Sequence, residues 1–228
     1  MGGDETTVID AAAERVILAR FAGLDDLTVV SEEVGVLGTG QTHVVIDPID
    51  GSLNAKRGIG FFSLSIAIAS GPTMGDVHLG FVHDFGTGEE WTAVSGEGAR
   101  LNGRPLRGDL PRAEIEILSF EATRTASVAE KAAAVVDLAY RLRIMGSLAL
   151  SLCHLAAGRV DAVCSLKPAR SVDIAAAQLL VRERGLAIDL PDAPPPFAAA
   201  PLDVEGRSRV VAAGTPELCR RLADALSA

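Results

Sequence analysis

The chain has 228 residues, 48% of them hydrophobic, and a formal net charge of −9. This size allows a substantial buried core, and the negative charge argues against nucleic acid or an anionic membrane as a partner. The three cysteines contain no C-x-x-C pair, the four histidines show no zinc spacing, and the longest apolar run is too short to span a bilayer. These features indicate a cytoplasmic protein with reduced thiols.

The first half of the chain predicts a helix followed by strands. Apolar residues up to Phe21 recur at helical spacing from Asp10 onward, which favours an amphipathic helix. Two short β-like runs then lead to acids, at Glu32 and at Asp47. Alternating polarity marks strands over residues 62–69, 77–82 and 90–94, an antiparallel meander closed by turns at 96–98 and 101–106.

From Glu114 onward the pattern changes to alternating strands and helices, which indicates an α/β arrangement. Strands are expected at residues 115–120, 142–144 and 162–165, and helices at 128–140, 147–157, 173–184 and 216–226. A proline-rich loop covers residues 191–201. We expect one compact unit built from a metal-binding α+β lobe, residues 1–112, and an α/β lobe, residues 113–228.

The segment DPIDGS at residues 47–52 concentrates oxygen ligands where an apolar run ends. Asp47 and Asp50 are three residues apart in a turn, so both carboxylates can face one point together with the Ile49 carbonyl. Mg²⁺ suits such a partial shell, which water and a substrate phosphate complete. Gly51 and Ser52 offer backbone N–H groups to an anion. The same residue types also form ordinary strand-ending turns, so a purely structural turn remains the alternative.

Three acids elsewhere in the chain are candidates to complete this site. Glu32 ends the earlier β-like run and could bridge two cations with Asp47, and Asp173 opens an Ala- and Leu-rich segment typical of a buried helix. Asp10 begins the first helix. An acid in the first turn of a helix is also favoured by the helix dipole, so Asp173 and Asp10 each have a structural explanation as well.

Four sequence blocks, in the same order, resemble the signatures of the inositol monophosphatase superfamily, the lithium-sensitive magnesium-dependent phosphatases. The blocks are VVSEE at 29–33, VIDPIDGSLN at 45–54, GS at 146–147 with AAGRVDA at 156–162, and VDIAA at 172–176. GGDETT at 2–7 and GIGFFS at 58–63 look most like the archaeal-type enzymes that act on inositol monophosphate and fructose 1,6-bisphosphate. The resemblance covers nearly the whole chain. It implies an α+β, layered α/β/α/β/α sugar-phosphatase fold with a metal cleft between the lobes.

The resemblance also implies roles for single residues. Glu32, Asp47, the Ile49 carbonyl and Asp50 match the ligands of two magnesium ions, and Asp173 matches an acid that binds the second ion near the substrate. Ser52 stands where the family usually has Thr. In the family, the hydroxyl of this Thr pairs with the acid matched by Asp10 and helps to activate the attacking water, and Glu32 is the third residue expected to take part in catalysis. The expected substrate contacts are Asp50, Gly51, Ser52, Asp173 and Arg170.

The expected function is therefore Mg²⁺-dependent hydrolysis of inositol monophosphate and/or fructose 1,6-bisphosphate by metal-activated water attack. The family implies two or three Mg²⁺ ions, Mn²⁺ as a substitute, Li⁺ as an inhibitor, and a homodimer. The alternative is a catalytically weak or inactive member that binds a phosphorylated ligand or a partner. Two observations motivate this alternative. Ser52 stands in place of the usual Thr, and we expect the family's N-terminal helical segment, with its loop for a weak third metal, to be missing before Gly2. A diguanylate cyclase, suggested only by GGDE at 2–5, is discounted because that motif belongs deep inside a domain.

Overall fold

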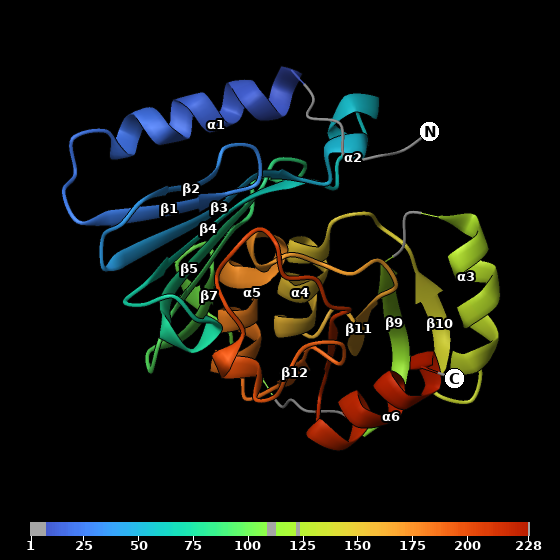
Figure 1. Ribbon diagram of the computed structural model, residues 1–228. Helices are drawn as coiled ribbons and strands as arrows, with labels where there is room; N and C mark the ends of the chain where they lie inside the picture. The colour runs from blue at the N-terminus through green and yellow to red at the C-terminus, as the bar shows by residue number, and fades with distance from the viewer. Residues whose placement is uncertain (1–7, 109–112, 122–123, 228) are drawn as a thin grey trace.

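The computed structural model describes residues 8–108, 113–121 and 124–227, in which helices and two sheets form five layers (Figure 1). Helix α1 (Val8–Phe21) covers the outer face of the first sheet. Helices α4 (Leu148–Ala156) and α5 (Ser171–Glu183) lie between the two sheets, and α3 (Thr125–Ala132) and α6 (Pro216–Ser227) lie beyond the second. This is the layered α/β/α/β/α arrangement expected from the sequence. None of the helices in the described ranges is long and apolar enough to cross a membrane.

The first sheet has eight strands in the order β2-β1-β3-β4-β5-β6-β7-β8. Most neighbours pair antiparallel, but β1 and β3 pair parallel, because the hairpin through β2 returns the chain to the starting end of β1. This parallel pair is an exception to the antiparallel lobe expected from the sequence. The strands are β1 (Leu27–Ser31), β2 (Gly35–Gly38), β3 (Thr42–Asp50), β4 (Ser63–Ala69), β5 (Val77–Asp84), β6 (Glu90–Val94), β7 (Gly98–Leu101) and β8 (Arg104–Pro105).

The second sheet has five strands in the order β10-β9-β11-β13-β12. Strand β9 pairs parallel with both β10 and β11, and the other pairs are antiparallel. The strands β12 and β13 have three residues each, too short to be recognised from alternating polarity. The strands are β9 (Ile115–Glu121), β10 (Ala139–Arg143), β11 (Ala162–Ser165), β12 (Ala187–Asp189) and β13 (Val211–Ala213).

The helix expected over residues 128–140 is wrong in its second half. Helix α3 ends at Ala132, a short 3₁₀ turn covers Ala133–Val135, and the chain then enters β10. Alanine-rich sequence favours a helix, but the backbone of β10 pairs with β9, with Ala139 opposite Ile115. This long-range pairing, which local propensity does not encode, decides the outcome.

The end of β3 is distorted at the segment that carries the predicted site. Its pairing with β4 is regular as far as Asp47 opposite Ser65 and then shifts by one residue, so that Asp50 lies opposite Ser63. Pro48 lies inside this bulge, where its missing N–H removes a ladder hydrogen bond. Gly51 then adopts φ 95° and ends the strand, and the short helix α2 (Ser52–Arg57) follows.

Both faces of the middle layer are buried. Helix α5 packs against α4 and strands β3 to β7 of the first sheet, and it also contacts β12 of the second. Ala175, Ala176 and Ala177 are at most 1% exposed. A Cβ on Gly80 of β5 would lie 2.4 Å from the Ala176 carbonyl oxygen. Small residues therefore allow α5 to approach the sheet closely, which fixes the position of its N-terminus.

Candidate functional site

Three acids meet where β1, β3 and α5 converge. Glu32 directly follows β1, Asp47 lies near the end of β3, and Asp173 lies in the first turn of α5. One carboxylate oxygen from each of the three lies within 4.8 Å of the others. The parallel register places Ser31 opposite Ile46, so the acids that follow these two residues are neighbours at the same edge of the sheet. Clustered carboxylate oxygens are the ligands that hard divalent cations prefer.

Asp50, the fourth predicted metal ligand, is oriented by the N-terminus of α4. Its Oδ2 accepts hydrogen bonds from the Ser147 hydroxyl and from the Ala149 backbone N–H at 2.7 Å. Ser147 is also the N-cap of α4, since its Oγ accepts from Leu150 N at 3.2 Å. Asp50 is therefore held beside the cluster through its Oδ2, and its Oδ1 is the oxygen that can still act as an acceptor.

The electrostatics of the cluster favour a bound cation. Burial, with the neighbouring Glu32, Asp50 and Asp173, raises the pKa of Asp47 well above its ordinary value. Burial also raises the pKa of Asp50 to about 7, with Asp173 adding to the effect and the bonds from Ser147 and Ala149 opposing it. Desolvation likewise raises the pKa of Glu32, although Arg170 opposes this. Ionised carboxylates crowded in this way are unfavourable until positive charge compensates them.

Arg170, the predicted substrate contact, lies against two of these acids. Its guanidinium donates to Glu32 Oε1 and, at 3.1 Å, to Asp173 Oδ1. Its backbone N–H donates to Asp173 Oδ2 at 2.8 Å. Burial would lower the pKa of Arg170, but Asp173 and Glu32 outweigh it and raise that pKa above its ordinary value. The guanidinium therefore remains a permanent positive charge at the edge of the cluster.

Of the two residues expected to handle the attacking water, Ser52 lies at the bulge of β3 and Asp10 lies in helix α1. The Ser52 hydroxyl donates to the Ile49 carbonyl oxygen at 3.0 Å. A hydroxyl has a single hydrogen, so in this arrangement it serves Ile49 and not Asp10. Asp10 is 5% exposed in the first turn of α1. The segment GGDETT at 2–7, which carried part of the family resemblance, lies outside the described residues.

Glu121 forms hydrogen bonds with residues next to the candidate site, and it was not among the residues predicted from the sequence. It lies at the end of β9, where its Oε1 accepts from the hydroxyls of Ser119 and Ser151 and its Oε2 accepts from Gly146 N, all at 2.8 Å. Gly146 in turn approaches Gly51, since a Cβ on Gly51 would lie 3.1 Å from the Gly146 carbonyl oxygen. The available signal was an acid directly after a predicted strand, the same signal that marked Glu32.

Asn54 of α2 joins the same two segments. Its Nδ2 donates to the carbonyl oxygens of Phe61 at 2.8 Å and Met145 at 2.7 Å. The turn after β3 is therefore tied to the loop before α4 by both a close backbone approach and a side-chain amide. Asn54 belongs to the block that resembled the family signature, but no role was predicted for it.

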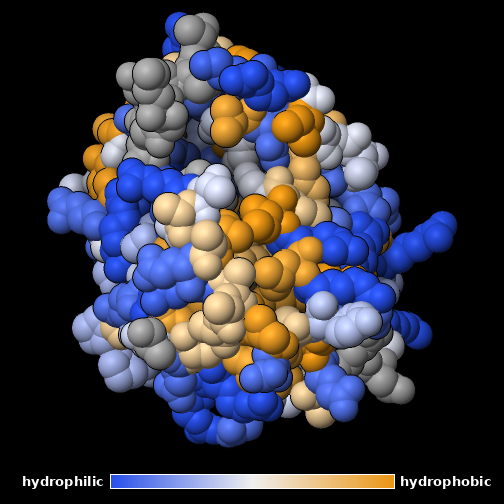
Figure 2. Space-filling model, turned by 90° about the vertical axis from the view of Figure 1, so that its right-hand side faces the viewer, coloured by the Kyte–Doolittle hydropathy of each residue, from blue (hydrophilic) through white to orange (hydrophobic). Residues whose placement is uncertain are grey.

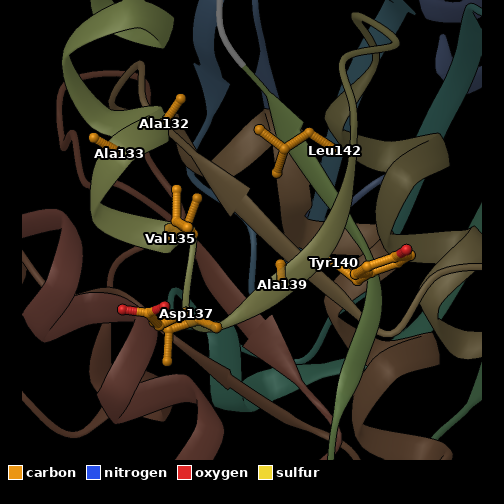
Figure 3. A pocket seen from close by; sticks show the side chains of 9 residues that line it. Ala132, Ala133, Val135, Asp137, Ala139, Tyr140 and Leu142 are labelled. Atoms are coloured by element: carbon orange, nitrogen blue, oxygen red, sulfur yellow. The ribbon is translucent and has the colours of Figure 1, made fainter.

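A separate hollow has none of these acids among its lining residues. It measures about 700 Å³ and is lined by the end of α3, the 3₁₀ turn and loop that follow it, and β10, one of the two edge strands of the second sheet (Figure 3). Apolar side chains gather on this side of the molecule (Figure 2). Val136, which lines the hollow, is 69% exposed. Asp137 is the one acid among the lining residues. This hollow lacks the clustered carboxylates, so the acids on β1, β3 and α5 remain the candidate site.

Comparison with known proteins agrees with this geometry. The family model described as the inositol monophosphatase family matches residues 2–227. A fructose-1,6-bisphosphatase/inositol-1-monophosphatase of Methanothermobacter thermautotrophicus is 32% identical over 98% of this chain and 84% of its own length. The Nus factor SuhB of Escherichia coli is 33% identical over 98% of this chain and 85% of its own length. The structure of the Thermotoga maritima IMPase matches with a TM-score of 0.82 and 26% identity, covering 100% of this chain and 87% of that one.

The family match and the names of the relatives indicate a phosphatase, and its clustered acids are of the kind that hold a metal ion. The chain belongs to the inositol monophosphatase family.

Proposed function

We propose that the protein is a Mg²⁺-dependent phosphomonoesterase that hydrolyses inositol monophosphate and/or fructose 1,6-bisphosphate. The observation that carries the proposal is the meeting of Glu32, Asp47 and Asp173, with one oxygen from each within 4.8 Å. The substrate class is supported by the relatives named as fructose-1,6-bisphosphatase/inositol-1-monophosphatase. The expected ligand is a small phosphorylated sugar or cyclitol.

The residues of the cluster fit a magnesium ion. Carboxylate oxygens are hard ligands, and the raised pKa of Asp47, caused first by burial and then by its acidic neighbours, reflects negative charge that a cation would stabilise. Glu32, Asp47, Asp50 and the Ile49 carbonyl would hold two ions, and Asp173 would bind the second of them. Bound there, Mg²⁺ would neutralise a phosphate dianion and lower the pKa of a water molecule.

Other residues named from the sequence would orient the reactants. Asp10 and Ser52 are proposed to position the attacking water, for which the Ser52 hydroxyl must turn away from the Ile49 carbonyl. The backbone N–H groups of Gly51 and Ser52 would face a phosphate oxygen. The forked donors of Arg170 suit the second phosphate of a bisphosphorylated sugar better than a neutral hydroxyl.

A second function is favoured by the relatives whose printed name is Nus factor SuhB. In this reading the protein binds a phosphorylated ligand or a protein partner and hydrolyses substrate slowly or not at all.

The homodimer expected from the family is also a proposal, and the apolar side that carries α3 and β10 (Figure 2) is a candidate surface for it. The net charge of −9 supports a small anionic substrate held by metal over direct binding of nucleic acid.

A phosphate-release screen distinguishes the two functions. Purified protein with Mg²⁺, with Mn²⁺, or with a chelator would be given inositol monophosphate, fructose 1,6-bisphosphate and adenosine 3′,5′-bisphosphate in parallel. The catalytic proposal expects release that requires the metal, is inhibited by Li⁺, and is lost in Asp47→Asn. Wild-type protein that binds Mg²⁺ but releases no phosphate from any of the three would favour the binding function.

A further inference from the structure

The Arg170 side chain lies among residues that would hold the metal. Its guanidinium contacts both Glu32 and Asp173, which belong to the three-acid cluster. The side chains of Arg170, Glu32 and Asp173 are 16%, 21% and 18% exposed, so this ion-paired group is open to solvent on one side. Asp47 is 2% exposed and lies deeper. The ion-paired group of Arg170, Glu32 and Asp173 therefore lies nearer the solvent than Asp47.

The contacts of Arg170 use the same chemical groups that a metal needs. A carboxylate oxygen that accepts a hydrogen bond from a guanidinium has less electron density to offer a cation, and two positive charges so close repel each other. In the sequence, Glu32 is 138 residues from Arg170, whereas Asp173 is three residues from it. The arginine therefore joins β1 to α5 across the cluster. Arg170 thus supplies the positive charge that crowded carboxylates require.

We propose that Arg170 is an internal counter-ion that competes with the metal: it neutralises Glu32 and Asp173 in the metal-free protein and releases Glu32 when the site is loaded. This inference rests on the proposed metal-dependent function and adds an order of events to it. Only after the release is the guanidinium able to turn toward a substrate phosphate. Metal loading and phosphate binding by Arg170 are therefore coupled, with the metal first.

The backbone makes Arg170 suitable for substitution. Asp173 Oδ2 is held by the Arg170 backbone N–H at 2.8 Å, and every substitution except proline keeps that bond. Arg170→Ala removes the charge and the side-chain contacts. Arg170→Gln keeps a polar side chain without the charge and carries the test if the Ala variant does not fold. Arg104 of β8 is exposed, so Arg104→Ala is a control with the same change in net charge.

The test is direct titration of chelator-stripped protein with Mn²⁺, with free Mn²⁺ followed by its electron paramagnetic resonance signal. This readout does not depend on turnover. Arg170→Ala and Arg170→Gln should bind Mn²⁺ about tenfold more tightly than wild type, the scale of one removed charge interaction. Arg104→Ala should change the affinity by less than about twofold, because exposed charges at a distance are screened.

Thermal unfolding of the same samples gives a second readout. Without metal, the Arg170 variants should unfold at a lower temperature than wild type, because their acids lack the counter-ion. With saturating Mn²⁺, the unfolding temperature of the Arg170 variants should rise by more than that of wild type. Unchanged or weaker Mn²⁺ affinity in folded Arg170 variants would overturn the competition while leaving metal-dependent catalysis intact. Absence of Mn²⁺ binding in wild type and variants alike would overturn the proposed function itself.

Discussion

Asp50→Asn replaces a carboxylate by an amide of the same shape, and it should stabilise the metal-free protein above neutral pH. Desolvation, with Asp173 and Glu121 nearby, raises the pKa of Asp50 from 3.8 to about 7, against the hydrogen bonds from Ser147 and Ala149. That difference corresponds to about 4 kcal/mol in the free energy of unfolding. It is an upper value, because the neighbouring carboxylates share protons with Asp50.

The sign of the effect follows from the direction of the pKa change. Asp50 has a higher pKa in the folded than in the unfolded protein, so its ionisation lowers stability fully above about pH 7 and not at all below about pH 4. The amide does not ionise. The variant should therefore exceed wild type in stability at pH 8 and match it near pH 4. For a chain of this length, 4 kcal/mol corresponds to a rise in Tm of about 8–16 °C.

The assay is unfolding of chelator-stripped protein by heat or urea at pH 4, 6 and 8. Asp224→Asn, on an exposed position of α6, is the control for the change in net charge. Addition of Mg²⁺ at pH 8 should reverse the order, since the ion stabilises wild type more than the variant. An Asn variant that is no more stable than wild type at pH 8, or equally more stable at every pH, would refute this account of the cluster.

Asp47→Asn should abolish phosphate release and weaken metal binding without loss of fold, and wild-type turnover would remove Asp47 from the mechanism. Ser52→Ala should lower kcat by about 10² if the hydroxyl orients the water, whereas Ser52→Thr should be tolerated; a severely damaged but folded Thr variant would contradict the family role. Arg170→Ala should impair hydrolysis of fructose 1,6-bisphosphate more than that of inositol monophosphate, and steady-state kinetics with equal losses would count against a phosphate contact. Gly51→Ala should lower stability by about 1–3 kcal/mol more than Gly103→Ala, because both glycines have positive φ but only at Gly51 would a Cβ crowd carbonyl oxygens. Equal urea midpoints for the two variants would contradict this.

The residues of the candidate site could be named from the sequence because most of them follow a local signal. Glu32 and Asp47 each come at the end of an apolar β-like run, and Asp173 opens an alanine-rich helix. Such positions lie at the ends of strands and helices whatever the rest of the fold is. The meeting of Glu32, Asp47 and Asp173 within 4.8 Å agrees with the expected metal site, although the metal itself and the role of each residue stay predictions.

What the sequence did not predict depends on contacts between distant segments. The ion pair between Arg170 and Glu32 joins residues 138 positions apart, and the hydrogen bonds of Asp50 come from Ser147 and Ala149 at the start of α4. No local pattern encodes either contact. The strand expected at residues 142–144 overlaps the end of β10, but the first residues of β10 were assigned to a helix for the same reason, because the pairing with β9 outweighs the helix propensity of the alanines before it.

The register between β1 and β3 has a consequence for where the chain tolerates a change in length. A one-residue deletion within β1 would turn Glu32 to the opposite face of the sheet, since successive side chains alternate. The hairpin that contains β2 lies at the edge of the sheet, and Val36 and Leu37 in it are 51% and 46% exposed. Glu32 lies in the turn between β1 and β2, so that turn must keep its length. Extra residues after Leu37, at the exposed far end of β2, would lie away from Glu32 and from the pairing of β1 with β3. The far end of β2 is therefore the suitable place for a fluorescent label or an affinity tag.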